Sequence, residues 1–423
     1  MKLDRRSALR ILGAGSLAAS LSGAAATQAG VAATQAQPSP GRGATAVTLP
    51  DKARFPFRGI HLNAAFAHPL GTHCQAAAQE FLNTRLNEVN KLWPVDNPRQ
   101  EAVEAFAGLI NASPDDVAVV PSTLVGENLL AEALRLGPGR GVVTDPFHYD
   151  ASLAMYGERH KRGMPLTVLP PRNQKIDYDE LRRAITPEIG LVAISWVSSW
   201  TGMTHDLKIV CEIAHEKGVP VYADVIQGVS ALPLDVAATG VDFCCAGTYK
   251  WLMGDFGVAF LYIRPTRLSS LRRVELGWRG LTSYVPHFLP YDKPGATDGD
   301  WSLGASAAQI FEVGTPNWCG LKVAAASIGY IRNVGVTEIV RHRTPLLDRL
   351  QAELPKIGFE PLTPKEYPGP SVVFAYRGAH DRFAHRLEAA GIYVSVSKNR
   401  IRISASVYND EQDIDRLIQL LNS

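Results

Sequence analysis

The chain has 423 residues, 46% hydrophobic and 20% charged, which is the balance of a globular protein and excludes a disordered one. The formal net charge is +2, but the first 36 residues hold four basic and one acidic residue, so the remainder holds 39 basic and 40 acidic ones. This near-neutral balance gives no electrostatic reason to expect a nucleic acid or an anionic membrane as partner. The five cysteines show no CxxC spacing, so neither a metal site nor a disulfide framework is predicted.

Residues 1–36 have the pattern of an export signal followed by a linker. A twin arginine, Arg5 and Arg6, precedes the apolar run "ILGAGSLAASLSGAAA", and small residues follow it. The run is too short and too rich in Gly and Ser for a membrane-spanning helix. It has no polar face, which disfavours the alternative of an amphipathic helix. We therefore predict export to the periplasm by the twin-arginine route, and no membrane association after the signal is removed.

Between residues 99 and 249, helix-like and strand-like segments alternate. Helical spacing is found at 99–110, 123–136 and 205–218, and short Val- and Ile-rich runs are found at 115–122, 141–146, 165–171, 189–197, 219–225 and 241–249. Short apolar strands separated by helices indicate a mostly parallel sheet covered on both faces.

The pattern changes near residue 320. Helices are predicted at 321–335, 341–354, 380–391 and 409–421, with strands in 370–378 and 392–407, which together indicate a small α+β domain. We predict a large domain at 37–318 and a small one at 319–423. Before this boundary, the stretch "YDKPGATDGDWSLGAS" at 291–306 is expected to be a long polar loop of a kind that is often functional.

Polar and aromatic residues follow the predicted strands. Ligands of open α/β sheets bind at the carboxyl ends of the strands, so these residues are expected to share one rim. They are Ser122, Thr123, His148, Tyr149, Ser198, Ser199, Thr201, Asp224, Gln227 and Lys250. Pyridoxal phosphate needs a lysine amine, an acid beside its ring nitrogen, a helix N-terminus for its phosphate and a stacked aromatic ring. The set therefore predicts this cofactor.

The same stretches resemble the fold-type I pyridoxal-phosphate enzymes, specifically the class V aminotransferase group, which includes cysteine desulfurases, kynureninase-like lyases and isopenicillin-epimerase-like proteins. The resemblance is carried by "HLNAA", "PSTLVGENLLA", "YADVIQG", "GTYKWLMG", "FEVGTPN" and "IRISASVYNDEQDIDRL". It implies an α/β fold, with a mostly parallel seven-stranded sheet in the large domain and a small α+β C-terminal domain.

The resemblance also implies roles for individual residues. Lys250 would be the Schiff-base lysine and proton carrier, Asp224 would pair with the pyridine nitrogen, and Gln227 would bond the ring hydroxyl. The phosphate would be held by Thr123, by the amide of Leu124 and by the hydroxyl of Tyr249, with Ser199 at the same rim and Thr315 reaching the phosphate of a second subunit in a homodimer. Tyr149 would stack on the cofactor, Asn63 would lie near the substrate, and Arg402 would bind the substrate carboxylate.

Simpler interpretations exist for several of these residues. Asp224 also suits a strand-end turn, Tyr149 suits a core position with His148 as the stacking ring, and the alternation of the last strand also allows Arg400 to face inward. Ser122 and Thr123 also suit helix caps, which is compatible with holding phosphate.

The sequence narrows the chemistry without choosing one reaction. Cysteine desulfurases carry a nucleophilic cysteine shortly before the carboxylate-binding arginine, and "GIYVSVSKNRIR" holds none, so sulfur transfer is disfavoured. We expect an aminotransferase-type enzyme acting on the amino group of an amino acid or peptide. An epimerase, a lyase or an oxidative siderophore- or peptide-tailoring enzyme is an alternative, and a non-catalytic binding protein of the same fold is another.

Overall fold

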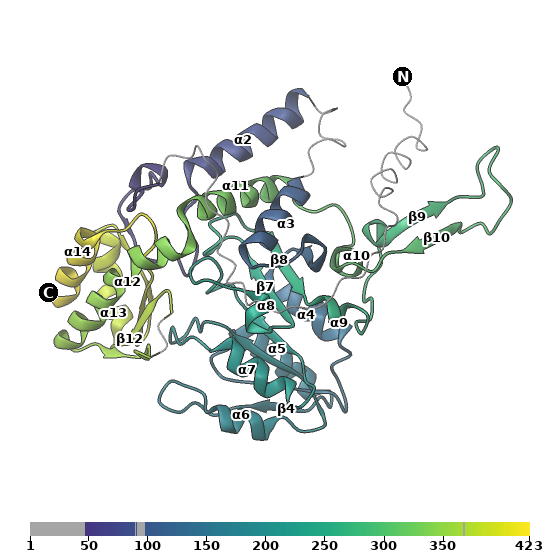
Figure 1. The fold of residues 1–423 in the computed structure, drawn as a ribbon. Helices are drawn as coiled ribbons and strands as arrows, with labels where there is room; N and C mark the ends of the chain where they lie inside the picture. Colours follow the sequence, from purple (N-terminus) through teal and green to yellow (C-terminus); the bar gives the residue numbers. More distant parts are fainter. Residues whose placement is uncertain (1–46, 89, 91–97, 367–368) are drawn as a thin grey trace, which may run out of the picture.

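The computed structural model describes residues 47–88, 90, 98–366 and 369–423 (Figure 1). The predicted export signal therefore lies outside the described residues. None of the helices in the described part is long and apolar enough to cross a membrane.

The centre of the molecule is a seven-stranded sheet, as predicted. Its order is β2 (Val117–Val120), β8 (Ala259–Ile263), β7 (Phe243–Gly247), β6 (Val221–Asp224), β5 (Ile189–Ser195), β3 (Gly141–Thr144) and β4 (Leu166–Val168). β8 runs antiparallel to both of its neighbours, and the pairs from β7 to β4 are all parallel. Strands buried on both faces explain why the sequence shows continuous apolar runs here.

Helices cover both faces of this sheet. Successive strand residues point to opposite faces, so Val119 belongs to one hydrophobic core and Val120 to the other. The first core includes side chains of α3 (Pro98–Leu109), α7 (Leu207–His215) and α11 (Trp318–Val334), and the second includes those of α4 (Thr123–Ala133), α5 (Asp150–His160) and α10 (Ala307–Phe311). The remaining helices of this part are α2 (Thr72–Asn87), α6 (Tyr178–Ala184), α8 (Val236–Thr239) and α9 (Pro265–Leu268), with 3-10 turns at Lys52–Arg54, Pro114–Asp116 and Trp278–Gly280.

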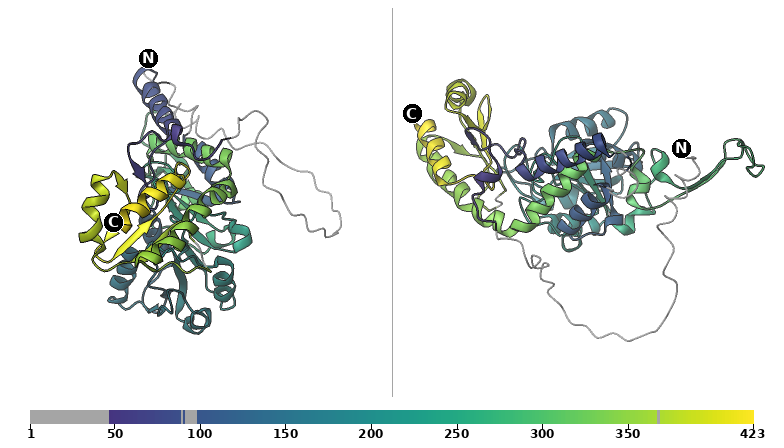
Figure 2. Two further views of the ribbon diagram at one scale, coloured as in Figure 1. Left: turned by 90° about the vertical axis from the view of Figure 1, so that its left-hand side faces the viewer. Right: turned by 90° about the horizontal axis from the view of Figure 1, so that it is seen from above.

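The C-terminal part forms its own antiparallel sheet. Its order is β11 (Glu360–Pro361), β12 (Val372–Ala375), β15 (Arg400–Ile403) and β14 (Ser395–Ser397). This sheet packs with α12 (Val336–Glu353), the 3-10 turn Leu354–Ile357, α13 (Ala379–Ala389) and α14 (Glu411–Asn422) around a separate core. Figure 2 shows this part at one end of the molecule.

The beginning of the described chain packs with the C-terminal part. β1 (Ile60–His61) pairs in parallel with β13 (Ile392–Tyr393), and Ile60 and Leu62 are buried in the C-terminal core. The segment lies there although the sequence analysis assigns it to the large domain. A two-residue strand paired with residues more than 300 positions away leaves no local sequence signal.

The stretch expected to be a polar loop contains a strand, so that prediction was wrong for residues 300–303. β10 (Asp300–Leu303) pairs with β9 (Leu281–Val285) in an antiparallel hairpin that projects from the molecule (Figures 1 and 2). Every residue of β10 is exposed, so neither face of the strand is buried against the body. Without a buried face, no alternation of apolar and polar residues is required, so this strand leaves no periodic pattern in the sequence.

Candidate active site

The site begins with Asp224, the last residue of β6. Its side chain is buried, and its Oδ1 accepts a hydrogen bond from the Ile226 amide at 3.0 Å. Burial raises the pKa of this carboxyl to about 6, while the neighbouring His148, the Ile226 amide and Lys250 limit the rise by favouring the carboxylate. Asp224 is therefore a buried acid held close to the point of ionisation.

Lys250 lies in the turn that follows β7, and β7 is the strand next to β6. Burial lowers the pKa of the Lys250 amine to about 8, a net value that includes an opposing effect of the Asp224 charge and a smaller lowering effect of the Arg402 charge. Its Nζ lies 5.6 Å from the centroid of the Tyr249 ring. The lysine predicted from sequence is thus a partly neutral amine next to a buried acid, as amine nucleophiles require.

Gln227 is held by two polar partners. Its Nε2 donates to the Ala65 carbonyl at 3.0 Å, and its Oε1 accepts from the indole N–H of Trp251 at 3.1 Å. The indole fixes the orientation of the amide, because it can only donate. One N–H of Gln227 is left for a ligand.

The N-terminus of α4 faces the same rim. The Ser122 hydroxyl caps the helix by accepting from the Val125 amide at 3.2 Å, and the Thr123 hydroxyl accepts from the Gly247 amide at 2.9 Å, which joins α4 to β7. Among the described residues, no acceptor engages the amides of Thr123 and Leu124. The geometry supplies the two free amides and the helix dipole that a phosphate requires.

Of the two neighbouring aromatic residues, Tyr149 is the one available for stacking. His148 is fully buried, and both of its ring nitrogens have side-chain partners. Tyr149 is 41% exposed at the start of α5, and burial, followed by the charges of Asp150 and Asp224, raises the pKa of its phenol. Its ring therefore lies near Asp224 without a competing structural bond.

Arg402 and Asn63 contribute unsatisfied polar atoms. Arg402 is buried and its Nη1 donates to the Ser199 carbonyl at 3.1 Å, while its Nε has no acceptor in the described structure. The Asn63 Oδ1 is also buried without a donor, and its backbone bridges Ser404. Unpaired buried groups of this kind suit a bound ligand. Ser199 contributes a carbonyl to this arrangement.

Arg400 has a different place. Its guanidinium carbon lies 4.1 Å from the centroid of the Trp200 ring, and its Nη1 donates to the Trp200 carbonyl at 3.1 Å. The pKa of Lys250 responds to Arg402. Of the two arginines left open by strand alternation, Arg402 is the buried one, and its charge lowers the pKa of Lys250.

Glu127 is a residue that the sequence analysis missed. Its Oε1 accepts from His148 Nε2 at 2.9 Å and from the Tyr156 hydroxyl at 2.8 Å, and its Oε2 accepts from the Ser152 hydroxyl at 2.6 Å. The charge of Glu127 raises the pKa of His148, against the effect of burial. A glutamate on the apolar face of the helix "TLVGENLLAEAL" was the available signal.

His148 connects this network to the site. Its Nδ1 lies 2.9 Å from the hydroxyl of Ser195, and Ser195 pairs with Asp224 across β5 and β6. When His148 is protonated, its charge favours the carboxylate form of Asp224.

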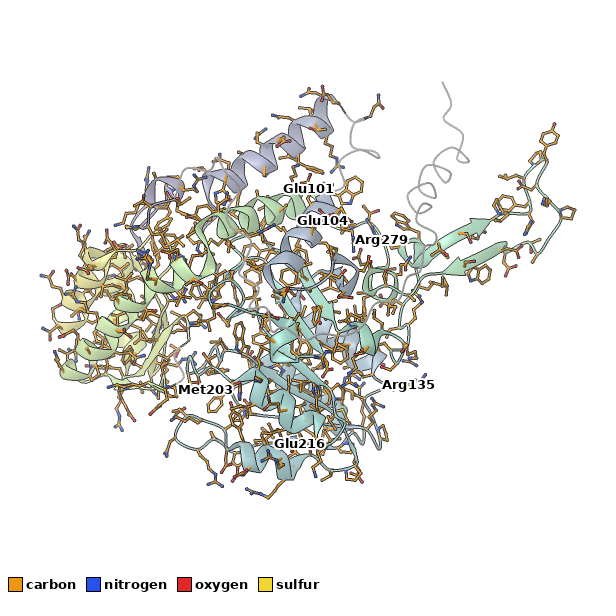
Figure 3. The ribbon with its side chains drawn as sticks, viewed as in Figure 1. Glu101, Glu104, Arg135, Met203, Glu216 and Arg279 are labelled. Carbon is orange, nitrogen blue, oxygen red and sulfur yellow. The ribbon has the colours of Figure 1, made fainter. Side chains whose placement is uncertain are left out.

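Thr315 lies on a loop that is anchored at Glu312. The buried Glu312 carboxylate accepts from Arg99 Nε at 2.8 Å and from the Val119 amide at 2.8 Å. Arg279, labelled in Figure 3 at the base of the hairpin, donates to the Gly314 carbonyl at 3.3 Å. Thr315 itself is exposed, so the structure holds the loop in place while its tip faces outward.

Comparisons with known proteins agree with this geometry. The aminotransferase class-V family model matches residues 95–417. An uncharacterized aminotransferase, YcbU of Bacillus subtilis, is 26% identical over 375 residues, covering 88% of this chain and 96% of that protein. Isopenicillin N epimerase of Streptomyces clavuligerus is 28% identical over 377 residues, covering 83% and 88%. The solved cysteine desulfurase CsdA of Escherichia coli has a TM-score of 0.77 at 22% identity, covering 89% and 98%.

The residues at the rim fit pyridoxal phosphate, the cofactor of this family. Lys250 would attach it, Asp224 would pair with the ring nitrogen, and the amides at the start of α4 would hold the phosphate. Tyr249 directly precedes Lys250, and its ring stacks on that of Phe256 with 4.7 Å between the ring centroids. Among the described residues, no group of histidine, cysteine and acidic side chains is arranged to hold a metal ion.

The lowered pKa of Lys250 predicts how cofactor uptake depends on pH. Only the neutral amine attacks the aldehyde, and with a pKa of about 8 the neutral fraction grows as pH rises through that value. We expect the rate at which the apoenzyme takes up pyridoxal phosphate, followed by visible absorbance, to rise up to about pH 8 and then level off. A rate that keeps climbing to the ordinary lysine value of 10.5 would show that burial does not lower the pKa.

The Glu127 network predicts a stability effect. Glu127→Ala leaves His148, Ser152 and Tyr156 buried without their acceptor, so unfolding free energy should fall by about 3–5 kcal/mol. Thermal and urea unfolding measure it. The matched control is Glu158→Ala, which removes an exposed ion pair with Lys161 and should leave the midpoint unchanged. Equal midpoints for the two variants would contradict the interpretation.

Proposed function

The chain belongs to the class V aminotransferase family, and on that premise we propose that it is an exported pyridoxal-phosphate-dependent enzyme acting on the amino group of an amino acid or peptide residue. The observation that carries the proposal is the setting of Lys250. Its largely buried amine lies under the influence of the Asp224 carboxylate and of the Arg402 guanidinium, which has an unpaired nitrogen. An amine, a carboxylate and a guanidinium group that can bind a substrate carboxylate together suit an α-amino acid.

Each residue has a definable task in such a reaction. When bound, pyridoxal phosphate supplies an electron sink for the pair released at the substrate Cα. The Lys250 Nζ takes up and returns the proton at Cα, which an amine of pKa about 8 can do near neutral pH. Asp224, supported by His148, keeps the proton on the ring nitrogen. Arg402 holds the carboxylate and so sets which Cα bond faces Lys250.

Sulfur transfer is disfavoured by the cysteines. Arg402 lies on β15, which forms a tight hairpin with β14, and this hairpin contains no cysteine. Burial raises the pKa of Cys74 and Cys211 to about 12, and it raises the pKa of Cys244 and Cys245 further. Thiols in this state are poor nucleophiles. Cys319, which is half-buried on α11, also has a raised pKa.

The reaction subtype is a matter for product analysis. Similarity to isopenicillin N epimerase supports epimerisation as the second candidate, alongside elimination and oxidative tailoring. Holoenzyme incubated with L- and D-amino acids, with and without a keto acid, separates them. A new amino acid appearing only with the keto acid identifies transamination, inversion identifies epimerisation, and ammonia with a keto acid identifies elimination. A protein that binds no pyridoxal phosphate would be the non-catalytic alternative.

A homodimer is part of the proposal. Thr315 is exposed on an anchored loop, and the hairpin beside it exposes large apolar side chains, Tyr284, Phe288, Tyr291 and Trp301. Exposed apolar surface of this extent suits contact with another protein surface. A second copy would cover the hairpin and bring Thr315 to its partner's phosphate site.

Arg402 gives a sharp test of substrate binding, because Arg400 is a matched control two residues away. Arg402→Met should lower kcat/KM for an α-amino acid about tenfold to a hundredfold, since a charged hydrogen bond to the carboxylate is lost. Arg400→Met removes an arginine that stacks on Trp200. Because this side chain is not assigned to substrate binding, kcat/KM should change less than about threefold. Equal losses in both variants, measured by steady-state kinetics, would argue against the assigned role.

Export and assembly have one combined test in a Gram-negative host. Changing Arg5 and Arg6 together to Lys should keep the protein in the cytoplasm, because the twin arginine is the recognised feature of the signal. Cell fractionation measures this, and sizing of the wild-type holoenzyme should give a dimer. Unchanged periplasmic accumulation of the variant would overturn the export proposal, and an active monomer would overturn the shared site.

A further inference from the structure

Arg343 is a buried cation outside the site described above. It lies on α12, is 2% exposed, and its Nη2 donates to the Ala231 carbonyl. Its Nε and Nη1 have no acceptor within the described structure. Because guanidinium groups carry five N–H donors and stay charged in proteins, this side chain is left with a buried charge and unused donors.

Among the described residues, Arg343 has no ion-pair partner. Its guanidinium carbon lies 5.3 Å from the centroid of the Trp251 ring, a cation–π contact. Burial lowers the pKa of Arg343 to about 10, and no carboxylate opposes this effect. A buried charge without a partner costs several kcal/mol, so its retention calls for an anion.

Arg343 lines a cavity of about 340 Å³. The cavity is bounded by residues of α12 and by Leu232, Lys365, Gly369 and Val372. Leu232, Val340, Leu347 and Val372 form its apolar lining, and Thr344 and Asp348 are among its polar lining. The volume is within the range of small-molecule sites, which are mostly apolar with a few polar groups that orient the ligand.

We propose that this cavity binds a small monocarboxylate with an apolar body, its carboxylate paired with Arg343. The exposed lining residues Asp348 and Lys365 carry opposite charges, so the single buried charge of Arg343 remains and favours a monoanion over a dianion such as a dicarboxylate or phosphate. The apolar lining suits an aliphatic chain. Inorganic phosphate therefore serves as the negative control ligand.

The cavity is separate from the amino-acid site but adjoins it through one side chain. The ring of Trp251 makes the cation–π contact with Arg343, and its indole N–H donates to Gln227 Oε1 at 3.1 Å. A carboxylate on Arg343 would therefore lie one residue layer behind the cofactor rim. The proposal needs no turnover and does not depend on the proposed function.

The experiment uses 4-methylpentanoate as the probe and holoenzyme carrying Arg402→Met, so that the active-site guanidinium cannot bind it. Isothermal titration should give one saturable site per chain. Binding of 4-methylpentanamide, which lacks the charge, and of phosphate should be at least tenfold weaker. Absence of saturable binding to the Arg402→Met protein would overturn the proposal.

Three further variants in this background locate the site. Arg343→Met should weaken the binding at least tenfold, while Arg349→Met, which removes a half-exposed arginine of the same helix paired with Asp415, should leave it unchanged. Thr344→Trp keeps Arg343 and fills the cavity from an exposed position, so it should also abolish binding even if Arg343→Met folds poorly. Equal affinities of Arg343→Met and Arg349→Met, or full binding by Thr344→Trp, would refute the assignment.

Discussion

The arrangement of the site depends on a carboxylate buried at the end of one strand and an amine buried after the next. Asp224 and Lys250 follow adjacent parallel strands, β6 and β7, so the sheet itself brings them to one edge. Burial favours the neutral form of both groups. It raises the pKa of the Asp224 carboxyl to about 6 and lowers the pKa of the Lys250 amine to about 8. Each limits the shift of the other, and both remain close to the pH at which proton transfer is useful.

Two further charged residues, Glu127 and His148, influence the ionisation of Asp224. Glu127 raises the pKa of His148, and His148 in turn favours the carboxylate of Asp224. The residues come from α4, from the loop before α5 and from β6, three elements that also carry the phosphate-type amides and the available ring of Tyr149. Electrostatic support and ligand binding are therefore built on the same rigid elements, as a preorganised site requires.

The sequence predicted the central sheet because its strands are buried on both faces and separated by helices, a pattern that is local in the chain. It also predicted that Asp224, Gln227 and Lys250 lie at one edge of the sheet, since residues that follow parallel strands share an edge. It did not predict β9 and β10, whose exposed faces require no apolar alternation, or the packing of β1 on the C-terminal part, which is a long-range contact. Glu127 was missed because its partners come from a different helix and the loop before it.

Among the buried polar groups of the described residues that have no hydrogen-bond partner, those of Asn63, Arg402 and Arg343 differ in what surrounds them. Near Lys250, a substrate carboxylate would satisfy the Nε of Arg402, whereas the Oδ1 of Asn63 requires an N–H or O–H donor. Arg343 lies on the other side of Trp251, with an apolar cavity beside it. A fold under selection for stability alone would replace such groups with apolar side chains, because an unpaired buried charge costs more than a well-packed hydrocarbon contributes. The two guanidinium groups are therefore the positions at which we propose that anions bind.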